Sequence, residues 1–143
     1  MHRKTFIQAT VLVISATFAM GLAAHTAASV KARVMFQVSD SDAAKWNMTL
    51  NNVKNVQQEL GAGKVSIEIV AFGPGIGMLK SDAVISNRVA EATQAGIHVA
   101  IFENTMKALK LTKADMNPDI IYVPADVVEI MKRQGEGWAY IKP

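Results

Sequence analysis

Residues 64–77 read KVSIEIVAFGPGIG, a strand-like run that ends in a cluster of glycines. Valine and isoleucine alternate with Ser66 and Glu68 before the run becomes continuously apolar, which is typical of a β-strand. Three glycines between residues 73 and 77 then interrupt the pattern, and a helical pattern follows as far as Gln94. A strand that leads through a turn into a helix is the repeating unit of an α/β fold.

The same order of strand and helix recurs along the chain. Further strands are expected at residues 32–39, 97–102 and 120–123, with a short last strand at 138–141. Further helices are expected after the caps at residues 39–42, after Asn104 or Thr105, and after Pro124. We therefore predict an α/β fold, a single three-layer α/β/α domain with a mainly parallel sheet of four to five strands.

The spacing of apolar residues predicts which helix faces are buried. The stripe on the first helix is Trp46, Leu50, Val53, Val56 and Leu60, opposite an amide-rich face of Asn47, Asn51, Asn52, Asn55 and Gln58. A second helix capped by Ser81-Asp82 would turn Val84, Ile85, Val89 and Ala92 inward. The helix after Pro124 would bury Val127, Ile130 and Met131.

The first 28 residues have the order of a secretory signal peptide. A basic start is followed by uncharged residues 6–24 and then by small side chains up to residue 29. We expect cleavage after Ala24 or Ala28, leaving residues 29–143 as a periplasmic or secreted domain without a membrane span. The alternative is an uncleaved anchor, because residues 6–24 are nearly long enough to cross a bilayer.

Composition excludes several classes of function. The 143 residues are 50% hydrophobic and include no cysteine, so the chain has no thiol nucleophile or persulfide carrier of its own. Its three histidines are scattered, and 6% aromatic content is too low for a base-stacking surface. Residues 29–143 contain 13 Lys and Arg and 12 Asp and Glu, which gives a net charge of +1. We therefore expect no metal, no cofactor and no nucleic-acid partner.

Polar residues on the strands predict that one face of the sheet is not purely apolar. Glu68, Gln37 and His98 interrupt strands that should be continuously apolar in a fully covered parallel sheet. Either this face is satisfied surface or carries a Glu–Lys pair, or it forms a subunit interface. Trp138 and Tyr140 lie in the short last strand, and we expect at least one of them to pack across a subunit boundary.

Candidate site residues lie where two predicted strands end. The segment from Gly73 to Gly77 lacks the third glycine of a dinucleotide loop and the Gly-Lys-Ser/Thr of a phosphate loop, so it indicates a tight turn against a neighbour. Asn104 and Thr105 follow the third strand, at the sheet edge where α/β proteins collect ligands. The alternative is that these two residues only cap a helix.

Three segments in order, residues 70–75 (VAFGPG), 101–106 (IFENTM) and 121–125 (IYVPA), resemble the DsrE/DsrF-like family. The chain is most similar to the exported branch described as intracellular sulfur oxidation DsrE/DsrF family proteins, over nearly all of residues 30–143. The resemblance implies a compact α/β domain that assembles into homo- or hetero-oligomers. Some members carry sulfur as a persulfide on a cysteine near the end of a strand.

The chain departs from that pattern at Phe102, where related exported sequences often have cysteine before Glu-Asn-Thr-Met. If the resemblance holds, Phe102 faces a pocket at the end of its strand; the alternative is that it fills the core. We expect a ligand site formed by Gly73, Gly75, Phe102, Asn104 and Thr105, with no catalytic residues. The expected function is a non-catalytic binding or scaffold subunit that forms homo-oligomers and is linked to sulfur metabolism. The alternative is a sulfur-relay component or enzyme subunit whose reactive thiol comes from a partner in that metabolism.

Overall fold

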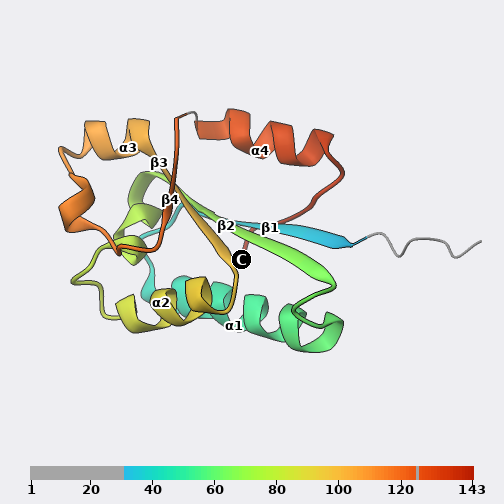
Figure 1. The fold of residues 1–143 in the computed structure, drawn as a ribbon. Coiled ribbons are helices and arrows are strands. Elements are labelled where there is room, and N and C mark those ends of the chain that lie inside the picture. The colour runs from blue at the N-terminus through green and yellow to red at the C-terminus, as the bar shows by residue number, and fades with distance from the viewer. Residues whose placement is uncertain (1–30, 125) are drawn as a thin grey trace, which may run out of the picture.

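Five parallel strands form the sheet at the centre of the fold, in the order β4-β3-β2-β1-β5 (Figure 1). The computed structural model describes residues 31–124 and 126–143, so the signal peptide expected over residues 1–28 lies outside the described residues. The strands are β1 (Ala32–Val38), β2 (Val65–Ala71), β3 (His98–Phe102), β4 (Ile121–Val123) and β5 (Ala139–Ile141). The predicted α/β class and parallel sheet are confirmed.

Helices cover both faces of this sheet. Figure 1 shows α1 (Ala43–Leu60) and α2 (Ser86–Gln94) side by side on one face, and α4 (Asp126–Gly135) on the other. The short helix α3 (Glu103–Ala108) directly follows the carboxyl end of β3. Two 3-10 helices, η1 (Gly73–Leu79) and η2 (Lys113–Asp115), complete the connections. The layers are therefore helix, sheet and helix, as a βα repeat predicts.

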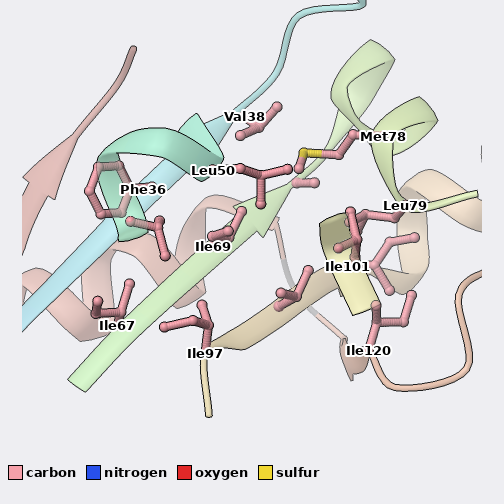
Figure 2. Close-up of a cluster of buried hydrophobic side chains, with 14 of the residues drawn as sticks. Phe36, Val38, Leu50, Ile67, Ile69, Met78, Leu79, Ile97, Ile101 and Ile120 are labelled. Atoms are coloured by element: carbon pink, nitrogen blue, oxygen red, sulfur yellow. The ribbon is translucent and has the colours of Figure 1, made fainter. Parts of the chain in front are cut away.

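The main core fills the space between the sheet and the helices α1 and α2. Phe36, Ile69 and Ile101 come from three neighbouring strands and are 0% exposed, and Leu50 of α1 lies over them (Figure 2). Complete burial of a side chain of this size contributes about 1.5–3 kcal/mol to folding. Of the predicted stripe on α1, Leu50 and Val53 are buried, whereas Leu60 is 47% exposed.

A smaller core lies on the other face, beneath α4. It is formed by Met35, Val70, Ala100, Phe102 and Ile130, with Phe72, Val123 and Trp138 packed around them. Every strand residue in this group belongs to the alternate set that faces away from the main core.

Helix α2 begins later than the sequence predicts. It starts at Ser86, and residues 81–85 form turns instead. Lys80 pairs with Met116 in an isolated bridge, and the Ser81 N–H donates to the Asp115 carbonyl at 3.0 Å. The Ala83 N–H donates to the Lys80 carbonyl at 3.1 Å and the Ser86 N–H donates to the Ala83 carbonyl at 2.9 Å, so these residues close turns in place of the predicted helix start. Val84, predicted to face inward, is therefore 88% exposed, and that prediction was wrong.

Helix α4 presents a different side to the sheet than the sequence predicts. Ile130 is buried, but Val127 and Met131 are 55% and 67% exposed, so two of the three predicted core positions were wrong. The inward face instead carries Ile130 together with Arg133, whose guanidinium meets the buried carboxylate of Glu68. A buried charge needs a partner, and satisfying Glu68 determines which side of the helix faces the sheet.

The polar face of the sheet is held by contacts within the chain. Glu68 is 2% exposed and lies 2.8 Å from Arg133 Nε, while the Tyr140 hydroxyl donates to Gln37 Oε1 at 2.7 Å. His98 is exposed on the same face. Trp138 packs into the smaller core, and the Arg133 guanidinium lies 4.8 Å from its ring centre. Glu68 is therefore held by an ion pair, but its partner is Arg133 and not the predicted lysine.

Candidate functional site

The carboxyl end of β2 leads into η1, which folds back across the end of β1. The Phe72 N–H donates to the Val38 carbonyl at 3.1 Å, and Gly73 adopts a positive φ of 51°. Gly75 is buried so close to β1 that a Cβ on it would lie 2.6 Å from the Val38 carbonyl carbon. Only glycine fits such a close approach of two backbone segments. This geometry is that of a tight turn against a neighbour.

A pocket of about 530 Å³ lies between this turn and α3, at the carboxyl ends of β2 and β3. Its lining consists of Gly73, Pro74, Asn104, Thr105, Ala108 and Leu109. The Gly73 N–H donates to Thr105 Oγ1 at 3.5 Å, which links the two walls. The volume is within the range of about 300–1,000 Å³ that small-molecule sites occupy.

Asn104 and Thr105 are wall residues and do not cap α3. The helix begins two or three residues earlier than predicted, at Glu103, and the N-cap position is Phe102, which makes no side-chain cap. Glu103 places a negative charge in the first turn, where the helix dipole favours it. The Asn104 amide and the Thr105 hydroxyl are therefore the polar groups that the lining offers to a ligand.

Phe102 does not line this pocket and belongs to the smaller core. Its side chain is 0% exposed, and its ring stacks on Phe72 with centroids 5.2 Å apart and planes at 24°. Of the five predicted site residues, the structure brings Gly73, Asn104 and Thr105 together around the pocket. Gly75 and Phe102 do not line it: Gly75 is buried in the turn against β1, and Phe102 is buried in the smaller core.

The lining of the pocket combines an amide and a hydroxyl with apolar groups. None of its six lining residues has a titratable side chain, so the lining has no group to donate or accept a proton in a reaction. Across the part of the chain that the structure describes, no three His, Asp or Glu residues are grouped closely enough to hold a metal ion. No helix among the described residues is both long and apolar enough to cross a membrane.

One charged cluster was not predicted as a unit. Arg133 Nε lies 2.8 Å from Glu68 Oε2 and 2.9 Å from Glu129 Oε1, and Arg133 Nη1 lies 3.3 Å from Glu136 Oε2. The contact with Glu68 is not in line with the single N–H of Nε, so it is an ion pair without a directed hydrogen bond. Burial raises the pKa of Glu68 above its ordinary value, and the Arg133 charge opposes that rise only in part. An isolated glutamate in an apolar strand was the sequence signal for this cluster.

Comparison with solved structures places the chain among proteins of the same fold. The protein MTH1491 from Methanobacterium thermoautotrophicum is 33% identical, with a TM-score of 0.75 over 78% of this chain and 99% of that one. The two chains belong to one family. MTH1491 is described as a protein of unknown function, so membership of its family gives the fold and assigns no activity.

A more distant structure shows the same fold. BT1422 from Bacteroides thetaiotaomicron, a conserved protein of unknown function, is 14% identical and has a TM-score of 0.68 over 82% of this chain and 99% of that one. No family model matches the chain, and no curated protein matches it.

Proposed function

We propose that this chain is an exported, non-catalytic binding subunit of the DsrE/DsrF-like type, which acts in sulfur metabolism by holding a small ligand or a partner segment. The observation that carries the proposal is the pocket at the carboxyl ends of β2 and β3. It offers one amide, one hydroxyl and an apolar wall, and its lining includes no acid, base or nucleophile. Such a lining supports the binding of a ligand without a chemical reaction.

Export is supported by the order of residues 1–28, which run from basic through apolar to small. The domain would then act in the periplasm or outside the cell.

Assembly into a homo-oligomer is supported by the outer face of α4. Val127, Val128 and Met131 are 55%, 58% and 67% exposed and lie on one helix, next to the smaller core. Adjacent exposed apolar side chains of this kind are typical of contact surfaces. Met131→Glu should therefore shift the mass measured by light scattering toward the monomer, whereas the control Asn55→Glu, at an exposed position of α1 on the other face of the sheet, should not. A wild-type chain that is monomeric at tens of micromolar would contradict the assembly.

The pocket itself is tested by nuclear magnetic resonance. Adding a small-molecule extract of the host should shift the amide signals of Gly73 and Thr105. Ala108→Phe, which fills the pocket, should abolish those shifts, and Ala114→Phe, which places the same ring on exposed η2, should preserve them. Equal shifts in both variants would place the ligand elsewhere.

A further inference from the structure

A second pocket, with a volume of about 260 Å³, lies between α1 and α2 on the face of the sheet that these two helices cover. Leu50, Val53 and Ile97 are buried at 5% or less and contribute apolar side chains to it, together with Ala92. The two helices run in the same direction here, since Arg88 contacts the early part of α1 and Ala95 contacts a later part. The α1–α2 groove, as we call it, is therefore an apolar channel with Arg88 toward one end.

Arg88 is held in place by the amide-rich face of α1. One terminal nitrogen of its guanidinium donates to Asn47 Oδ1, and the other donates to Asn51 Oδ1 at 2.7 Å. These contacts use two of the five N–H groups of the guanidinium and leave three. Because amide oxygens are neutral, they orient the guanidinium and leave its charge uncompensated.

No acidic residue neutralises this guanidinium within the described part of the chain. The ion pairs found among residues 31–124 and 126–143 involve Lys45, Lys80 and Arg133, and none involves Arg88. Arg88 is also the third residue of α2, whose first turn contains no acidic side chain. The positive end of the helix dipole therefore adds to the charge of Arg88.

The other charged side chains around the groove do not reverse its positive net charge. Lys54 of α1 and Glu91 of α2 also line it, so the three charged lining residues Lys54, Arg88 and Glu91 leave a net charge of +1. The far end is closed by Gln57, whose side-chain N–H donates to the Ala95 carbonyl at 2.8 Å. An anion is thus favoured at the Arg88 end and an apolar group along the rest.

We propose that the α1–α2 groove binds a small amphiphilic carboxylate, with its carboxylate on Arg88 and its hydrocarbon chain over Leu50, Val53 and Ile97. A guanidinium matches a carboxylate in both charge and planar geometry. The groove exceeds the apolar cavity of about 150 Å³ that accommodates benzene, so a chain of several carbons fits. This site is separate from the pocket at Gly73 and Thr105 and does not depend on the function proposed for it.

The test uses octanoate as the probe and 1-octanol as its neutral counterpart, each titrated into the full chain by nuclear magnetic resonance. Octanoate should shift the amide signals of α1 and α2 and should bind the wild type about tenfold or more tightly than octanol. Arg88→Gln should weaken octanoate binding by a similar factor and leave octanol binding unchanged. Ala95→Phe should obstruct both ligands, whereas Gln94→Phe on the neighbouring exposed position should affect neither.

Several results would overturn the proposal. These are no saturable binding of octanoate, equal affinities of the wild type for octanoate and octanol, or shifts centred on Gly73 and Thr105. The comparison of the two probes on the wild type tests the role of charge even if Arg88→Gln fails to fold.

Discussion

Replacing Arg133 with methionine should destabilise the fold in a way that depends on pH. Arg133 is the only cation within 4 Å of Glu68 among the described residues, and Glu68 is 2% exposed. Methionine is close in length to the apolar stem of Arg133, but it removes the guanidinium that lies over the Trp138 ring and leaves Glu68 and Glu129 without their shared counter-charge. Removing one partner of a buried ion pair typically costs about 3–5 kcal/mol, a large part of a typical domain's stability.

The pH dependence follows from the pKa of Glu68. Burial already raises this pKa above its ordinary value of 4.5, Glu129 adds to the rise, and the charge and contact of Arg133 lower it. Arg133→Met removes the lowering causes, so the pKa of Glu68 in the folded protein rises further. A carboxyl with a raised folded pKa contributes most to stability below its unfolded pKa, and that contribution is lost as pH rises through the folded value. The loss relative to wild type should therefore be full at pH 7 and shrink to about 1 kcal/mol near pH 4.5, where mainly the cation–π contact is missing.

Urea unfolding followed by circular dichroism at pH 4.5, 5.5, 7 and 8 measures this difference directly. The control is the double variant Glu68→Gln/Arg133→Met, which removes the buried charge and should regain most of the stability at pH 7. A loss of the same size at every pH, or a double variant less stable than the single one, would refute the reasoning.

Two further predictions concern Gly75 in the turn after β2 and Phe102 at the end of β3. Gly75→Ala should destabilise the chain by about 1–3 kcal/mol in urea unfolding, because the new Cβ overlaps the Val38 carbonyl. The control Gly63→Ala should not destabilise it, because a Cβ at Gly63 has no atom within 4 Å. Equal stability of the two variants would contradict the close approach of Gly75 to Val38. Phe102→Cys should cost about 2–4 kcal/mol and react with an alkylating reagent more slowly than Asn55→Cys on the exposed face of α1, because position 102 is fully buried. Fast alkylation with little loss of stability would instead show that position 102 opens into the pocket.

The elements that could be predicted from sequence are those whose side-chain pattern is set by local geometry. The β1, β2 and β3 strands follow the predicted apolar runs to within one residue at each end, and α1 begins after Asp42, whose side chain accepts from the Ala44 N–H at 2.8 Å. Because ligands collect at the carboxyl ends of parallel strands, Gly73, Asn104 and Thr105 were predicted to form one site, and all three line the same pocket.

The features that could not be predicted depend on contacts between distant segments. The rotation of α4 is determined by Glu68, which lies far from it in sequence, and an amphipathic pattern alone favoured Val127 and Met131 as inner residues. The turns that precede α2 follow the bridge between Lys80 and Met116, which joins segments far apart in the sequence. On the amide-rich face of α1, Asn47 and Asn51 bind Arg88 of α2, a contact that the pattern of a single helix cannot reveal.

Native mass spectrometry of the protein purified from its host tests the central claim, a binding subunit with its site at the carboxyl ends of β2 and β3. The account predicts a chain that begins after Ala24 or Ala28, an oligomeric mass, and a bound small molecule or partner that is present with wild type and with Ala114→Phe but lost with Ala108→Phe. A monomer that begins at Met1 and has the same composition in all three proteins would contradict it.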